Sequence, residues 1–137
     1  MQLKYDEDQI AFRDEVRAFM ADKAQLALGE DARHGMHLTK DEVIAWHKAL
    51  AERGWIAPKW PVEHGGAGWD PIQVHIFDEE AFAAGMPRLP NFGLNYVGPV
   101  VIHFGDDWQK ERFLGPILSG DEIWCQGFSE PGAGSDL

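Results

Sequence analysis

Residues 124–136 read WCQGFSEPGAGSD, and the character of the chain changes at this stretch. The mostly apolar residues 123–128 predict a short strand, and the run of breakers at residues 130–134 predicts a tight loop directly after it. Glycines permit backbone conformations closed to other residues, so successive N–H groups here could converge on an anionic or polar ligand. A tight turn between two strands explains the same composition, and both interpretations stay open.

Three well-known motifs share part of this stretch, and each is incomplete. Residues 132–134 (GAG) lack the third glycine of a dinucleotide-binding fingerprint, and no Gly-Lys-Ser/Thr completes a phosphate-binding P-loop. Residues 127–131 (GFSEP) lack the final glycine of a nucleophile elbow. The motifs therefore do not support Rossmann, P-loop or serine-hydrolase chemistry.

Upstream of this stretch, the chain is patterned as helices. Apolar residues at helical spacing predict a first helix from Asp6 to about Leu28. Thr39 and Glu42 form a capping-box pattern that begins a second helix, which Gly54 ends. Further helices are expected over residues 70–85, with Asp70 as the N-cap, over residues 91–104, and from Asp106 or Asp107 to Gly120.

Two segments between these features carry specific expectations. Residues 55–68 contain two prolines and three glycines, which exclude a helix or a central strand and predict a shaped loop. Residues 91–104 are apolar on most sides, which predicts a buried helix. Gly93 and Gly98 within that helix predict a kink or close packing.

The composition is that of an ordinary globular protein, with 137 residues of which 45% are hydrophobic and 26% charged. One domain is the default expectation at this length. Twelve basic residues against 23 acidic ones give a formal charge of −11, so the basic footprint of a nucleic-acid-binding protein is missing. We therefore expect no nucleic-acid partner. An anionic ligand would need local help from backbone N–H groups.

The cysteine content and the pattern of apolar residues bear on the cellular location of the protein. The single cysteine, Cys125, excludes an internal disulfide framework and indicates a reducing compartment, so we expect a cytoplasmic protein. The amino terminus lacks the pattern of a signal peptide, and no run approaches the ~18 apolar residues of a membrane span. Because Cys125 lies in a mostly apolar predicted strand without a basic neighbour, we interpret it as a small core residue.

The remaining titratable residues favour structural roles. His34 and His37 are close in sequence, but no cysteine or carboxylate cluster completes a metal site there, and we expect no metal. His47 lies on the apolar stripe of the second helix and is interpreted as a packed, hydrogen-bonded residue. Glu79 and Glu80 are interpreted as part of a solvated helix face.

Three segments, taken in order, resemble the acyl-CoA dehydrogenase family. Residues 58–68 (PKWPVEHGGAG) are similar to its proline and Gly-Gly loop, and residues 104–120 are similar to the segment before its middle domain. Residues 128–136 (FSEPGAGSD) are close to the family signature at the start of that domain. The resemblance implies a mainly α fold. Residues 1–121 would form the amino-terminal helical-bundle domain, and residues 122–137 the first strand and loop of an incomplete middle β domain.

The resemblance also implies an activity. Family members use FAD and a carboxylate base to convert an acyl-CoA thioester to a trans-2-enoyl-CoA. Carried over residue by residue, it implies that Gln126, Phe128 and Ser129 lie along the flavin. Gly134 and Ser135 would lie near the FAD pyrophosphate and the acyl-CoA pantetheine, with Ser135 as a substrate-binding residue. The family's catalytic glutamate lies beyond the matching stretch, so no catalytic residue is assigned.

Partners and alternatives follow from the same resemblance. It implies an acyl-CoA substrate, an electron-transfer flavoprotein or similar acceptor, and a homo- or hetero-oligomer. Residues 126–129 (QGFS), together with residues 87–90 (PRLP) and 95–99 (NYVGP), look like those of bacterial members acting on bulky or unusual acyl-CoAs. Two alternatives stay open. One is an acyl-CoA oxidase-like flavoprotein, and the other is a non-catalytic helical interaction module that needs a partner chain to cover its sheet edge and apolar helix faces.

Overall fold

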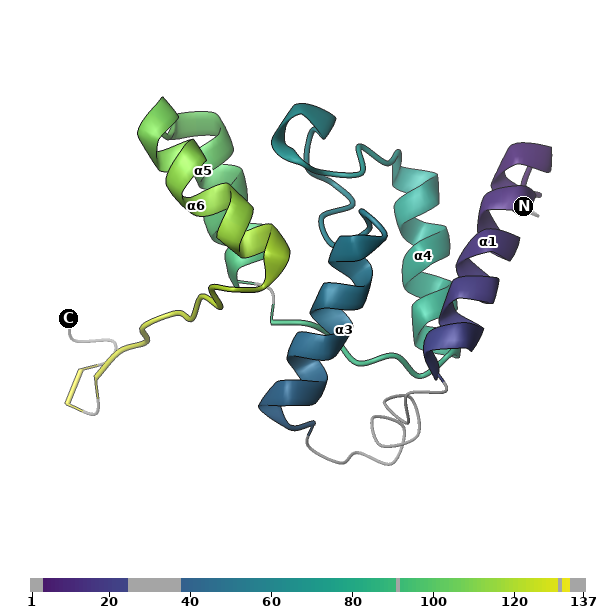
Figure 1. The fold of residues 1–137 in the computed structure, drawn as a ribbon, viewed down its shortest axis with the longest axis horizontal. Coiled ribbons are helices and arrows are strands. Elements are labelled where there is room, and N and C mark those ends of the chain that lie inside the picture. The colour runs from purple at the N-terminus through teal and green to yellow at the C-terminus, as the bar shows by residue number, and fades with distance from the viewer. Residues whose placement is uncertain (1–3, 25–37, 91, 131, 134–137) are drawn as a thin grey trace. The chain divides into compact units, whose positions relative to one another are not determined.

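A computed structural model describes residues 4–24, 38–90, 92–130, 132 and 133 of the chain (Figure 1). The predicted mainly α fold is confirmed, because the described residues form helices and no strand. The chain divides into two compact units, residues 1–89 and residues 90–137.

The described residues of the first unit form three α-helices, which begin where the sequence signals predict. In the capping box of the second, the Thr39 hydroxyl accepts a hydrogen bond from the Glu42 N–H, and the Glu42 carboxylate accepts one from the Thr39 N–H at 2.6 Å. Asp70 caps the third helix by accepting from the N–H groups of Ile72 and Gln73. The predicted end of the first helix near Leu28 lies outside the described residues. The helices are α1 (Glu7–Ala24), α3 (Lys40–Glu52) and α4 (Pro71–Ala83).

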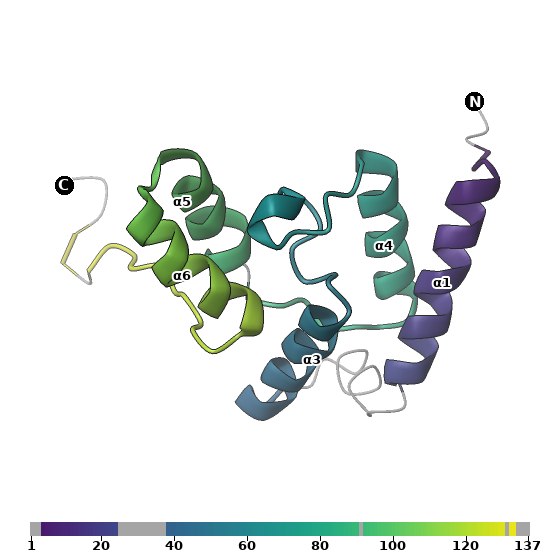
Figure 2. The same cartoon turned by 45° about the horizontal axis from the view of Figure 1, so that its top comes forward.

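An aromatic cluster forms much of the core of this unit. Helices α1 and α4 lie side by side in both views (Figures 1 and 2). Trp55, which follows α3, lies at the centre of the cluster, with ring centroids 4.9 Å from Phe19, 5.6 Å from Trp69 and 6.2 Å from Phe77. Trp46 of α3 stacks on Phe19 at 6.1 Å. Burial of these large rings removes much apolar surface from water and stabilises the unit.

The predicted shaped loop between α3 and α4 is confirmed. The Ala67 N–H donates to the Ala57 carbonyl at 3.1 Å, and the Trp69 N–H donates to the Pro58 carbonyl at 2.9 Å, so the loop is closed by its own backbone. A short 3-10 turn, η1 (Val62–His64), forms its tip. Residue 66 must be glycine for steric reasons, because a Cβ there would lie 2.1 Å from a backbone carbonyl oxygen.

The second unit is a short helical hairpin. It consists of η2 (Phe92–Val97), which is a π-helix, α5 (Gly98–Phe104) and α6 (Asp107–Ser119). Of the two expected caps, Asp106 is the one used, since its carboxylate accepts from the Gln109 N–H at 2.8 Å. The close packing predicted at Gly93 is confirmed, because an added Cβ would lie 3.2 Å from the Ile117 side chain.

The predicted burial of residues 91–104 is wrong for one side of this segment. Leu94 is buried, but Tyr96, Val100 and Phe104 are 58%, 56% and 85% exposed. These three residues are four apart in sequence and share one side of the η2–α5 segment. Helix α6 packs against this segment and leaves that side open among the described residues, so an apolar sequence alone did not determine burial.

The strand expected at residues 123–128 is not confirmed. The described residues there have no regular secondary structure. A strand needs backbone hydrogen bonds to a second strand, and the described part of the chain offers none. None of the described helices is long and apolar enough to span a membrane.

Candidate functional site

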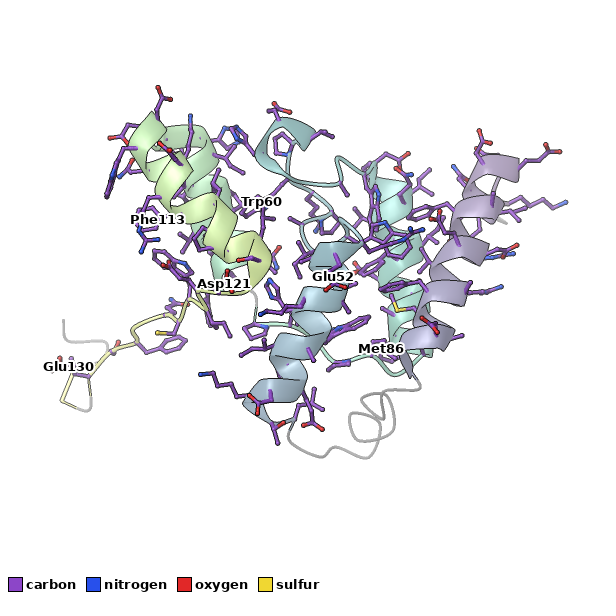
Figure 3. The ribbon with its side chains drawn as sticks, viewed as in Figure 1. Glu52, Trp60, Met86, Phe113, Asp121 and Glu130 are labelled. Atoms are coloured by element: carbon purple, nitrogen blue, oxygen red, sulfur yellow. The ribbon has the colours of Figure 1, made fainter. Side chains whose placement is uncertain are left out.

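The candidate site begins where α6 ends. Gly120 adopts a left-handed conformation with φ of 76° and ends the helix. The chain then folds back along α6, because the Glu122 N–H donates to the Pro116 carbonyl at 3.2 Å and the Glu122 carboxylate pairs with Arg112 at 2.7 Å. The hydrogen bond that the Arg112 guanidinium donates to the Glu122 carboxylate raises the pKa of Arg112 above its ordinary value. Figure 3 shows Phe113 on α6 and Asp121 at the turn.

Trp124 packs against the helical hairpin. Its ring meets Phe113 edge-on, with the centroids 5.5 Å apart and the planes at 80°. On another side it approaches the buried Gly93, where an added Cβ would lie 3.3 Å from the Trp124 Cδ1 atom. The indole N–H is buried and has no hydrogen-bond partner among the described residues. The sequence interpretation missed this residue because it treated Trp124 only as part of a strand.

The residues assigned to the flavin follow Trp124 directly. Gln126, Phe128 and Ser129 are exposed, as are all six residues from 125 to 130, and the Phe128 ring is 77% exposed. None of the three is hydrogen-bonded to the described part of the chain. A turn follows, in which the Ala133 N–H donates to the carbonyl of Glu130, the labelled residue at the far end of the tail from α6 (Figure 3). Gly134 and Ser135 lie outside the described residues.

Two glycines of this segment, Gly127 and Gly132, are among the described residues. Gly127 and Gly132 have no positive φ, and a Cβ at either position would meet open space. Both glycines are exposed among the described residues of the segment.

The donor set of this segment fits the polar edge of a flavin. An isoalloxazine ring takes hydrogen bonds at its carbonyl and nitrogen atoms, and it accepts aromatic side chains at its edge or face. Gln126 offers an amide, Ser129 a hydroxyl and Phe128 a ring, alongside uncommitted backbone N–H groups. Such N–H groups favour negative charge on the ligand they contact.

The interpretation of Cys125 as a core residue is wrong, because the structure leaves its thiol exposed. Ile123 and Cys125 flank Trp124 and are both exposed, whereas Trp124 is packed. Successive side chains of an extended backbone point to opposite sides, so Ile123 and Cys125 share the side that faces away from the helices when Trp124 packs on them.

The histidines and the two glutamates that the sequence analysis considered do not form a site among the described residues. His47 is 7% exposed within α3, as expected of a packed residue. His34 and His37 lie outside the described residues, within which no group of three or more potential ligands could hold a metal. Glu79 is exposed, as predicted for a solvated face, but Glu80 pairs with Arg17 of α1 at 2.7 Å. The solvated-face interpretation is therefore wrong for Glu80.

Comparison with known proteins identifies the family. Residues 6–121 match the family described as acyl-CoA dehydrogenase, N-terminal domain. The chain belongs to the acyl-CoA dehydrogenase family. It is 42% identical over 133 residues to acyl-CoA dehydrogenase IpdE1 of Mycolicibacterium smegmatis, a match that covers 92% of this chain and 33% of the relative. It therefore spans about a third of the length of that acyl-CoA dehydrogenase.

Solved structures of acyl-CoA dehydrogenases share the fold. The chain superposes on the Tcur3481-Tcur3483 steroid ACAD with a TM-score of 0.78 and 33% identity, covering 99% of this chain and 35% of that one. The ChsE4-ChsE5 complex from Mycobacterium tuberculosis gives a TM-score of 0.76 at 33% identity, with 99% and 34% coverage. Acyl-CoA dehydrogenases are generally FAD-dependent.

Proposed function

We propose that this chain is part of an FAD-dependent acyl-CoA dehydrogenase that converts an acyl-CoA thioester to a trans-2-enoyl-CoA. The observation that carries the proposal is the segment 126–129, whose donors are exposed and uncommitted in a chain of this family. When bound, FAD supplies the acceptor for the hydride that leaves the substrate's β carbon. No residue of this chain is assigned as the base that removes the α proton.

The described residues have binding and orienting roles in this proposal. Gln126, Phe128 and Ser129 hold the flavin through amide, ring and hydroxyl contacts, and their backbone N–H groups favour negative charge on the ring. Gly134 and Ser135 lie near the pyrophosphate and the pantetheine, and Ser135 binds substrate. This assignment makes residues 1–121 the helical domain and residues 122–137 the start of the middle β domain.

We further propose a bulky acyl group and an oligomeric enzyme. Two solved relatives support this extension: one is named a steroid ACAD, and both names pair two polypeptides. An electron-transfer flavoprotein or a similar carrier would then reoxidise the enzyme. A cytoplasmic location remains part of the proposal.

A titration with FAD tests the cofactor assignment. In the enzyme that contains this chain, Phe128→Ala should weaken FAD binding, measured by quenching of flavin fluorescence. Phe82→Ala is a matched control, because Phe82 on α4 is 82% exposed against 77% for Phe128. Ser129→Ala and Ser135→Ala should also weaken binding of FAD or acyl-CoA. Equal FAD affinity in the Phe128 and Phe82 variants would refute the assignment.

Product analysis tests the reaction class and the alternatives. A dehydrogenase should form enoyl-CoA with an added electron carrier and consume little oxygen, whereas an oxidase should form hydrogen peroxide without a carrier. The non-catalytic alternative is favoured by the exposed Tyr96, Val100 and Phe104. It predicts that the protein binds no FAD and self-associates or requires a partner chain.

A further inference from the structure

We infer that Trp124 is a positioning residue, whose ring holds the start of the segment 126–129 against η2 and α6. The inference rests on the proposed function, because its consequence for FAD requires that this segment contact the flavin. The juxtaposition of Trp124 with Phe113 and Gly93 carries the assignment.

Trp124 marks the boundary between packed and exposed chain. Its side chain is partly buried and its indole nitrogen fully so, while the next six residues are all exposed. A residue spans at most about 3.6 Å of extended chain, so Gln126 stays within ~7 Å of this anchor. Fixing Trp124 therefore restricts where the flavin-contacting residues can lie.

Two neighbouring residues of α6 hold the segment at alternate positions. Arg112 pairs with Glu122 at 2.7 Å, and Phe113 meets the Trp124 ring at 5.5 Å. The Arg112 guanidinium also lies over the Phe113 ring, 5.1 Å from its centroid. The alternation matches an extended backbone, in which every second side chain faces the same way.

The ring, and not the indole N–H, supplies the contact. The N–H has no partner among the described residues, so phenylalanine should replace tryptophan with little loss. Alanine would leave the segment without its anchor. FAD binding would then have to order residues 125–130 itself. The conformational entropy lost in that ordering would lower the affinity for FAD.

The first test measures FAD affinity in the enzyme that contains this chain. Trp124→Ala should raise the dissociation constant for FAD by about fivefold to tenfold, whereas Trp124→Phe should change it by less than about twofold. Trp108→Ala is a matched control. Trp108 also meets Phe113, at 5.8 Å and 81°, but it is 64% exposed at the other end of α6.

The second test does not depend on FAD. A nitroxide spin label on Cys125, with any cysteine outside these 137 residues replaced by serine, reports the motion of the segment in the flavin-free protein. Trp124→Ala should sharpen the spectrum, and Trp124→Phe should leave it unchanged. Gly93→Ala is a second variant for the case that Trp124→Ala does not fold. It keeps every side chain but places a Cβ 3.3 Å from the Trp124 ring, so it should also sharpen the spectrum.

The outcomes separate the two hypotheses. Unchanged FAD affinity in Trp124→Ala, equal losses in Trp124→Phe and Trp124→Ala, or an equal loss in Trp108→Ala would each overturn the positioning role. If the wild-type enzyme binds no FAD, the proposed function fails, and the spin-label spectra alone decide whether Trp124 anchors the segment. A mobile label in the wild type and in Trp124→Phe would then overturn the inference.

Discussion

Arg17 on α1 and Glu80 on α4 are joined by a charged hydrogen bond of 2.7 Å that connects residues 63 positions apart. The hydrogen bond to Glu80 raises the pKa of Arg17 above its ordinary value. The two side chains differ in exposure, at 54% for Arg17 and 14% for Glu80. The contact connects two helices that also share the aromatic cluster.

Replacing the carboxylate of this pair should loosen α1 from α4. We expect Glu80→Gln to lower the urea midpoint of unfolding by a small, measurable amount, because a partly exposed ion pair contributes little. Glu79→Gln is the neighbouring exposed control and should have no effect. The difference between the two variants should shrink as salt is added. Equal midpoints at low salt would contradict the prediction.

The capping box of α3 should make stability depend on pH. The hydrogen bond from the Thr39 hydroxyl, followed by that from its backbone N–H, lowers the pKa of Glu42. A carboxyl group whose pKa is lower in the folded state stabilises the protein at pH values above its unfolded-state pKa. This contribution is lost as the pH falls through the folded-state pKa. Wild type should therefore be more stable than Glu42→Gln near neutrality, and the two should converge in acid. Urea titrations from about pH 7 to about pH 3 measure this; a constant difference would exclude it.

Gly66 should be the least replaceable glycine of the loop between α3 and α4. A Cβ there would lie 2.1 Å from the backbone carbonyl oxygen of Trp60, which cannot move without opening the loop. Gly66→Ala should cost at least about 2 kcal/mol of unfolding free energy. Gly115→Ala, inside α6, should cost clearly less, because an added Cβ there meets no other part of the chain and only the following Pro116 opposes it. Denaturant unfolding of both variants checks the contrast.

Trp46 should be among the most sensitive core positions. It is 2% exposed and stacks on Phe19 at 6.1 Å. Trp46→Ala should destabilise the protein by about 3 to 5 kcal/mol, because truncation removes apolar contacts and leaves a cavity. The exposed Trp108 is again the control, and Trp108→Ala should cost no more than about 1 kcal/mol. Similar thermal midpoints for the two variants would argue against the core assignment.

Local signals predicted the helix starts and the loop. Thr39, Asp70 and Asp106 cap helices because each carries its side-chain acceptor within reach of nearby N–H groups. The loop of residues 55–68 followed from its prolines and glycines in the same way. Signals of this kind act over a few residues, so a single sequence contains them in full.

Features that depend on distant neighbours could not be predicted. Cys125 and the predicted strand needed knowledge of a pairing strand, and the exposure of Phe104 needed knowledge of which faces α6 covers. The contact of Trp124 with Phe113 joins a residue after α6 to a residue within it, and no periodic pattern in the sequence relates the two positions. The assignment of Gln126, Phe128 and Ser129 came from a family resemblance, since exposed donors in a loop have no distinctive local pattern.

The loop at Ala57–Trp69 has a practical consequence. Its backbone is fixed by its own hydrogen bonds, yet Val62 at its tip is 69% exposed. A side chain at this position is therefore attached to a hydrogen-bonded backbone and is exposed to water. Val62→Cys would thus give an attachment point for a dye or a heavy-atom cluster, and distances measured from that label would report the position of the first unit.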